Sequence, residues 1–182
     1  MSANGKEKIT EYLKSNILVT DGAMGTYFAS LYDTKEPPEY CNIKDSKKIY
    51  DIHRQYIENG AKIIRTNTYA CNTFTLNYEI EDVKESIKCA CKIAREAAKG
   101  HEDIFIAGDI GPITYNHNDM QKQVSDEYVV IAKTMIESGV DAIVFETFPD
   151  MDDIKEALKY IERIQPRIVI PMHYRSHEFG YD

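Results

Sequence analysis

Residues 57–69 read IENGAKIIRTNTY, and residues 136–148 repeat the pattern as IESGVDAIVFETF. Each block reads as a helix end, a glycine that stops the helix, a short apolar strand, and then a polar residue followed by threonine and an aromatic. A repeated helix–glycine–strand unit predicts a parallel α/β fold. Ligands bind such folds at the carboxyl ends of the strands, where Asn67 and Glu146 stand. The repeat therefore predicts an architecture and two candidate site residues together.

The composition is that of a soluble globular chain with an acidic balance. The 182 residues carry a formal net charge of −8, and 43% of them are hydrophobic. This length is enough for one domain with its own core. The negative charge argues against a nucleic-acid or anionic-membrane binder. The N-terminus is polar, and no apolar run approaches the roughly 20 residues of a membrane helix. We therefore expect a cytoplasmic protein.

Short apolar runs alternate with amphipathic stretches along the whole chain. Strands buried on both faces of a parallel sheet are predicted at 17–20, 62–66, 104–107, 142–145 and 167–170. Helices are predicted at 46–59, 82–98, 125–138 and 150–164, the second starting with a capping box of Asp82 and Glu85. The order predicts right-handed βα units. A closed (β/α)8 barrel needs about 250 residues, so we expect an incomplete (β/α)8 TIM barrel of about five βα units, or a smaller open sheet.

Two strand ends carry carboxylates in positions that suit a ligand. Asp21 opens the sequence Asp21-Gly22-Ala23-Met24-Gly25-Thr26, where two glycines let the backbone approach a ligand and present N–H groups. The alternative is a tight turn capped by Asp21. Glu146 ends an apolar strand, where an unpaired carboxylate is costly. A ligand ammonium and a protein lysine or arginine are both suitable partners for Glu146, and we favour the ligand.

The second and third strands end in polar residues with two interpretations each. Asn67 can donate and accept hydrogen bonds, which suits an amino-acid ligand, but it equally fits a helix N-cap. Asp109 lies in a Gly-Pro turn and is interpreted as a carboxylate that supports the site or as a turn cap. Arg65 lies within its strand, and we interpret it as structural.

The cysteines and the last histidines do not form a metal-ligand pattern. The cysteines are Cys41, Cys71, Cys89 and Cys91. The last two are two positions apart in a helical stretch and point to different faces, and we interpret all four as buried thiols in a reducing compartment. His173 and His177 are four apart and could ligate a metal together on a helix. We interpret them as exposed and unliganded.

The set of strand ends resembles the homocysteine S-methyltransferase family, which includes the N-terminal domain of cobalamin-dependent methionine synthase. It also includes bacterial enzymes that join this domain to a methylenetetrahydrofolate reductase. The resemblance spans residues 9–150 and rests on Asp21-Gly22-Ala23-Met24-Gly25-Thr26, Thr66-Asn67-Thr68-Tyr69, Gly111-Pro112 and Glu146-Thr147. It implies a (β/α)8 barrel and methyl transfer to the thiol of homocysteine in methionine biosynthesis. Zinc, held by three cysteines of later strands, activates that thiol. The methyl donor stays open, with methyltetrahydrofolate and methylcobalamin among the candidates.

The resemblance also implies roles for individual residues. Asp21 and Glu146 would hold the substrate ammonium, and Asn67 would line the same mouth. The substrate carboxylate would be received by backbone amides of Gly22, Ala23, Met24, Gly25 and Thr26. The cysteines of this chain match no zinc-ligand motif, so neither a catalytic residue nor a metal ligand is assigned. We expect homocysteine binding without activity of the chain alone.

Residues 151–182 form a divergent tail, predicted as a helix and a strand in the same compact unit as residues 1–150. The stretch 164–175 is similar to a late segment of metallo-β-lactamase-fold hydrolases, but their other metal-ligand motifs are absent and metal binding is not assigned to His173. Three further interpretations stay open. They are a non-catalytic amino-acid binder, a structural half-barrel that forms a homo-oligomer through exposed sheet edges, and a metallo-hydrolase.

Overall fold

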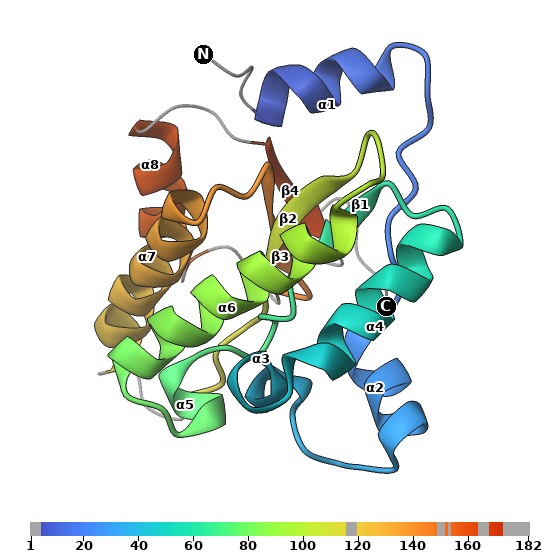
Figure 1. Cartoon of the computed structure of the whole chain (residues 1–182). Helices are drawn as coiled ribbons and strands as arrows, with labels where there is room; N and C mark the ends of the chain where they lie inside the picture. Colours follow the sequence, from blue (N-terminus) through green and yellow to red (C-terminus); the bar gives the residue numbers. More distant parts are fainter. Residues whose placement is uncertain (1–4, 116–119, 149–151, 153, 164–167, 173–182) are drawn as a thin grey trace, which may run out of the picture.

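A parallel sheet forms the centre of the computed structural model, which describes residues 5–115, 120–148, 152, 154–163 and 168–172. Its strands are β1 (Ile63–Arg65), β2 (Phe105–Ile110), β3 (Ala142–Glu146) and β4 (Ile168–Met172). They lie in the order β1-β2-β3-β4, and every neighbouring pair is parallel (Figure 1). The predicted α/β class with a parallel sheet is therefore confirmed.

Helices fill the connections between the strands. They are α1 (Gly5–Leu13), α2 (Met24–Tyr32), the 3-10 helix η1 (Pro38–Tyr40), α3 (Cys41–Lys44), α4 (Ser46–Glu58), α5 (Thr73–Leu76), α6 (Ile80–Ala98), α7 (Gln121–Glu137) and α8 (Lys155–Arg163). Helices α4 and α7 are followed by Gly60 and Gly139, whose φ angles of 100° and 81° reverse the chain as only glycine does easily. No helix in the described part of the chain is both long and apolar enough to span a membrane.

Three elements differ from the sequence-based expectation. The first predicted strand is reduced to one bridge between Thr20 and Ile63, and Ile17 is 84% exposed. Helix α6 begins at Ile80, which packs against the core, so the predicted capping box starting at Asp82 is wrong. Helix α7 begins four residues before the predicted start at residue 125, because Val124 is also buried.

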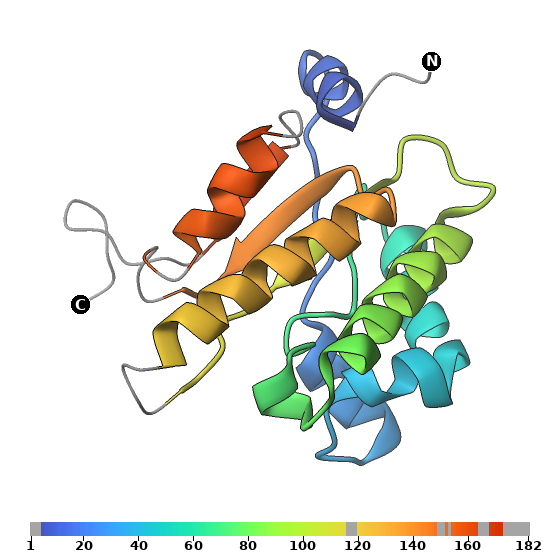
Figure 2. The ribbon, with the colours of Figure 1, turned by 90° about the vertical axis from the view of Figure 1, so that its left-hand side faces the viewer.

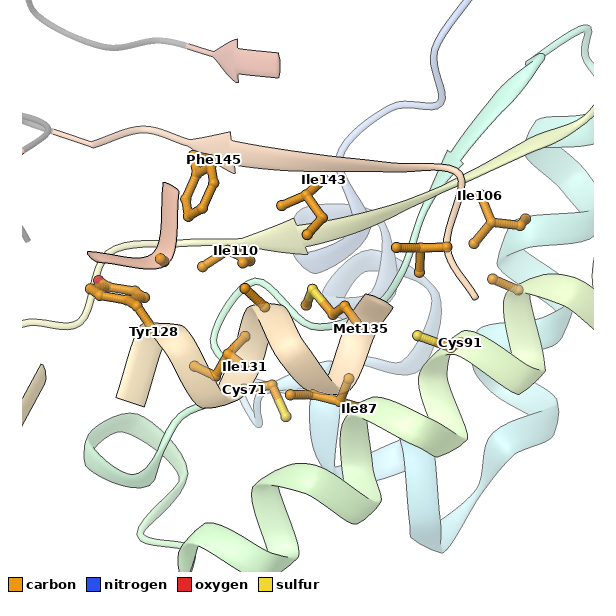
Figure 3. Packing of buried hydrophobic residues seen from close by; sticks show 14 of the residues in the cluster. Cys71, Ile87, Cys91, Ile106, Ile110, Tyr128, Ile131, Met135, Ile143 and Phe145 are labelled. Carbon is orange, nitrogen blue, oxygen red and sulfur yellow. The ribbon is translucent and has the colours of Figure 1, made fainter. Parts of the chain in front are cut away.

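The two faces of the sheet are covered differently. Figure 3 shows strand residues Ile106, Ile110, Ile143 and Phe145 facing α6 and α7. These two helices lie side by side against the sheet (Figure 2). On the opposite face a smaller cluster comprises Ile63, Phe105, Ala107, Ala142 and Val144, with Ile9 of α1 packed on it. Helix α1 therefore covers the side where the strands begin, and the loops at the carboxyl ends are left to form a site.

Candidate substrate site

The loops at the carboxyl ends of the strands enclose a cavity of about 370 Å³. Every residue predicted for the site lines it, namely Asp21, Gly22, Ala23, Met24, Gly25, Thr26, Asn67 and Glu146. The wall also contains Asp109, which the sequence offered as a carboxylate that supports the site, and Tyr69 and Thr147 of the strand-end motifs. Glu39 and Arg65 line it too, and the sequence did not assign either of them to the site. The tertiary structure thus brings the predicted strand ends together around one cavity, while their binding of a ligand stays a prediction.

Arg65 lies in the wall of this cavity with its side chain 12% exposed. Its Nε donates to Asp21 Oδ1 at 2.8 Å, its Nη1 donates to the Glu146 carboxylate, and its Nη2 donates to the Gly22 carbonyl at 2.9 Å. The Arg65 backbone N–H also donates to Asp21 Oδ2 at 2.9 Å. The protein arginine that the sequence left as an alternative partner of Glu146 is therefore Arg65. Strand alternation could have revealed it, because Arg65 shares a face with Ile63, away from the helices.

The carboxyl groups in the cavity outnumber this guanidinium. Burial raises the pKa of Asp21, although the charge and hydrogen bonds of Arg65 act in the opposite direction. Burial acts to lower the pKa of Arg65, but Asp21, Asp109 and Glu146 together raise it, so the guanidinium stays charged. If all three carboxyl groups were ionised, the cavity would carry an excess of negative charge.

Asp109 differs from Asp21 and Glu146, which form ion pairs with Arg65. Its side chain lines the cavity and the residue is 6% exposed, yet Oδ1 has no hydrogen-bond partner among the described residues. Burial, followed by the nearby Glu146 carboxylate, raises the pKa of Asp109 well above its usual range. The Asp109 backbone is held by Thr66 and Thr68, through bonds of 3.2 Å to its N–H and 2.6 Å to its carbonyl. Asp109 lies within β2 and not in a turn, so its interpretation as a turn cap is wrong, while its support of the site stays a prediction.

Asn67 lines the cavity, but its amide nitrogen is committed elsewhere. Nδ2 of Asn67 donates to Asn42 Oδ1 at 2.8 Å, and Nδ2 of Asn42 donates back to the Asn67 carbonyl at 2.8 Å. These two hydrogen bonds between Asn42 and Asn67 connect α3 to the loop that follows β1. The alternative role of Asn67 as a helix N-cap is wrong, because Asn72 caps α5 by accepting from the Thr75 N–H at 2.8 Å.

The first turn of α2 contributes backbone donors to the cavity. The N-cap residue Ala23 makes no side-chain capping bond, and the geometry of a helix leaves its first N–H groups without intrahelical acceptors. These belong to Met24, Gly25 and Thr26, which line the cavity. A helix N-terminus favours an anionic group such as a carboxylate. Gly22 has a different reason to be glycine, since a Cβ there would lie 2.9 Å from the Tyr56 hydroxyl.

Thr147 carries backbone strain next to Glu146. Its φ of 65° lies in the left-handed region, where a β-branched residue is a true outlier. Such strained residues cluster at functional sites, because the surrounding structure must hold them in place. The strain therefore indicates that the surrounding structure holds the backbone at the end of β3, next to the cavity, in an unfavourable conformation.

The described residues do not fit the zinc that the family resemblance implies. Among them, no group of three or more histidine, cysteine, aspartate or glutamate side chains is arranged to hold a metal ion. Cys71 and Cys91 are each 1% exposed, and burial raises the pKa of both thiols to about 12, so they stay protonated. His173 and His177 lie outside the described residues.

Gly111, where the loop after β2 meets the loop after β1, is expected to be intolerant of alanine. A Cβ would lie 2.7 Å from the Tyr69 carbonyl oxygen, which already accepts the Gly111 N–H at 3.0 Å. We expect Gly111→Ala to lower the free energy of unfolding by about 1–3 kcal/mol in urea denaturation. Gly25→Ala is the control, because no neighbouring atom lies within 4 Å of its Cβ, and it should leave the free energy of unfolding nearly unchanged. If Gly111→Ala had the same free energy of unfolding as the wild type, the close approach of residue 111 to the Tyr69 carbonyl would be contradicted.

Comparisons with known proteins agree on one family. The family model described as homocysteine S-methyltransferase matches residues 18–179, which extends beyond residue 150 and includes most of the tail. The separate resemblance proposed for residues 164–175 therefore overlaps a segment that matches the family model. Strand β4 likewise continues the parallel sheet next to β3.

Among individual relatives, the chain is 30% identical over 167 residues to methionine synthase of Mycobacterium leprae (strain TN), a match that covers 82% of this chain and 14% of that protein. It is 29% identical over 176 residues to methionine synthase of Mycobacterium tuberculosis (strain ATCC 25618 / H37Rv), which covers 87% and 15%. The chain thus spans only a small part of these relatives.

Solved structures show the same fold. The apo form of the homocysteine methyltransferase MmuM from Escherichia coli superposes with a TM-score of 0.74 at 19% identity, over 93% of this chain and 64% of that one. The metallated form gives a TM-score of 0.75 at 18% identity, over 88% and 64%. From the match of the family model over residues 18–179, the chain belongs to the homocysteine S-methyltransferase family.

Proposed function

We propose that this chain forms the part of a methyltransferase that holds the amino-acid end of homocysteine. The observation that carries the proposal is the cavity lined by Arg65, where four carboxyl-bearing residues accompany one guanidinium beside the first turn of α2. An α-amino acid presents an ammonium and a carboxylate on one carbon. The excess of carboxyl groups suits the ammonium, and the backbone donors of α2 suit the carboxylate.

In this arrangement the ammonium would lie near Asp21 and Glu146, which keep Arg65 as a shared partner. The carboxylate would accept hydrogen bonds from the N–H groups of Met24, Gly25 and Thr26. The reaction proposed for the whole protein is methyl transfer to the homocysteine thiol in methionine biosynthesis. The names of the mycobacterial relatives support this proposal, although the match covers only 14–15% of their length.

The isolated chain is expected to bind substrate without turning it over. In the family a zinc ion makes the thiol a better nucleophile, and the residues described here offer no place for it. Neither methyltetrahydrofolate nor methylcobalamin is favoured as donor by any described contact. The chain's own contribution is therefore to bind and orient the amino acid.

Calorimetry with L-homocysteine tests this function. We expect saturable binding to the wild type and a loss of affinity of about tenfold or more for Glu146→Gln, since hydrogen bonds to charged groups contribute about 1.5–3 kcal/mol. The ligand 4-mercaptobutanoate differs from homocysteine only in lacking the ammonium group. It should bind the wild type no more tightly than homocysteine binds Glu146→Gln. The matched control is Glu81→Gln on the exposed surface of α6, which should bind like the wild type. Equal affinity for homocysteine and 4-mercaptobutanoate would rule out the proposed ammonium site.

A further inference from the structure

Two carboxyl groups in the cavity wall each have one oxygen without a hydrogen-bond partner among the described residues, namely Glu39 Oε2 and Asp109 Oδ1. Glu39 accepts the Ala70 N–H through its other oxygen at 2.9 Å. Asp21, which precedes α2, and Glu146, at the end of β3, each bind the guanidinium of Arg65. Asp109 lines the same wall from β2, is nine-tenths buried, and its Oδ1 has no hydrogen-bond partner in the described part of the chain. Asp109 therefore needs either a proton or a cation from outside.

The charged groups around Asp109 do not neutralise its carboxylate. Arg65 attracts its negative charge, whereas Glu146 and Asp21 repel it. Tyr69 faces it from the loop after β1 and is electrically neutral when protonated. On the helix side, Met135 of α7 packs against the neighbouring Gly108 and offers no charge. Among the described residues that line the cavity, Arg65 is the sole cation, and two other carboxylates already share it.

An ionised Asp109 beside Glu146 would place two carboxylates together in a site with little solvent, an arrangement in which one of the pair ordinarily holds a proton. We propose that Asp109 keeps its carboxyl proton while the cavity is free of ligand, and releases it to solvent when a ligand ammonium group binds beside it. The O–H bond of Asp109 breaks and the proton passes to buffer. The ammonium keeps all of its own protons and pairs with the new carboxylate.

This inference rests on the proposed function, because it needs an ammonium ligand in this cavity. Its consequence is a linkage between binding and pH. A ligand that expels protons binds more tightly as the pH rises, and one proton released per ligand corresponds to a tenfold gain in affinity per pH unit. Asp109 is thus a positioning residue whose charge appears only with the ligand.

Calorimetry with L-methionine measures the proton directly. Methionine has the amino-acid group of homocysteine but no thiol that could release a proton of its own. Titrations in buffers with different ionisation enthalpies, from about pH 5.5 to about pH 7.5, give the number of protons released per ligand. We expect a release that approaches one for the wild type and none for Asp109→Asn. Asp126→Asn, on the exposed surface of α7, should behave like the wild type.

A purely structural role of Asp109 would weaken binding in Asp109→Asn without changing the proton count. If Asp109→Asn does not fold, infrared difference spectra of the wild type provide a second measurement, in which methionine should remove a protonated-carboxyl band. Methionine binding without proton release at any of these pH values, or equal release from Asp109→Asn, would overturn the inference and leave the proposed function standing. Absence of binding by both methionine and homocysteine would overturn both.

Discussion

Replacing Arg65 with methionine is expected to lower the free energy of unfolding by about 3–5 kcal/mol, the usual cost of removing one partner from a buried ion pair. The Arg65 side chain is 12% exposed, and its partners Asp21 and Glu146 are 4% and 18% exposed. Without the guanidinium, both carboxylates and Asp109 would remain in a cavity that contains no other described cation. Urea denaturation of the wild type and the variant at pH 7 measures the difference.

The destabilisation by Arg65→Met should shrink in acid. Carboxyl groups that lose their cation take up protons at higher pH than before, so the penalty falls as the pH falls and they become neutral. The matched control is Lys122→Met, which removes an exposed ion pair with Asp126 and should cost about 1 kcal/mol or less. A loss below about 1 kcal/mol for Arg65→Met as well would show that the Arg65 cluster contributes little to stability.

His53 is expected to make the fold sensitive to acid. It lies on the buried face of α4, is fully buried, and neither ring nitrogen has a hydrogen-bond partner among the described residues. Burial lowers the pKa of His53 from 6.5 to about 4. The unfolded chain therefore takes up a proton first, and stability that is complete above pH 6.5 is lost as the pH falls towards 4. A shift of this size corresponds to about 3 kcal/mol.

The His53→Leu variant isolates this contribution. The difference in unfolding free energy between wild type and His53→Leu should change by about 3 kcal/mol between about pH 7 and about pH 4, with the wild type losing more. Buried carboxyl groups with raised pKa values, such as Glu39, are common to both proteins and cancel. Ile52→Val, at a buried position of α4 that carries no titratable group, should keep the pH dependence of the wild type. Parallel pH profiles for wild type and His53→Leu would contradict the buried neutral histidine.

The order of elements was predictable because its signals are local. The glycine after each of α4 and α7 and the apolar runs of β1, β2 and β3 can be recognised within a few residues. The first strand was predicted from its apolar sequence, but it forms only the Thr20–Ile63 bridge. A strand forms only where a neighbouring strand accepts and donates its backbone hydrogen bonds. An apolar sequence does not show how many of its residues will pair in this way.

The candidate site was predictable as a place but not as a set of interactions. Parallel strands bring their carboxyl ends to one edge, so Asp21, Asn67 and Glu146 could be grouped from the sequence. The amide of Asn67, however, binds Asn42, which sits 25 positions earlier and has no recognisable motif. The same side chain chemistry fits a ligand, a cap or a buried partner, and only packing selects among them.

By itself, the sequence determined the parallel α/β architecture, the family resemblance and the strand ends that share an edge, because hydrophobic period and turn residues act over short distances. Only the tertiary structure decided that Arg65 joins Asp21 and Glu146, which lie 44 and 81 positions away. It also decided that Asp109 Oδ1 is buried without a hydrogen-bond partner among the described residues. The physical reason is that the ionisation of a buried group depends on every charge and the amount of solvent around it, and these are set by the folded chain as a whole.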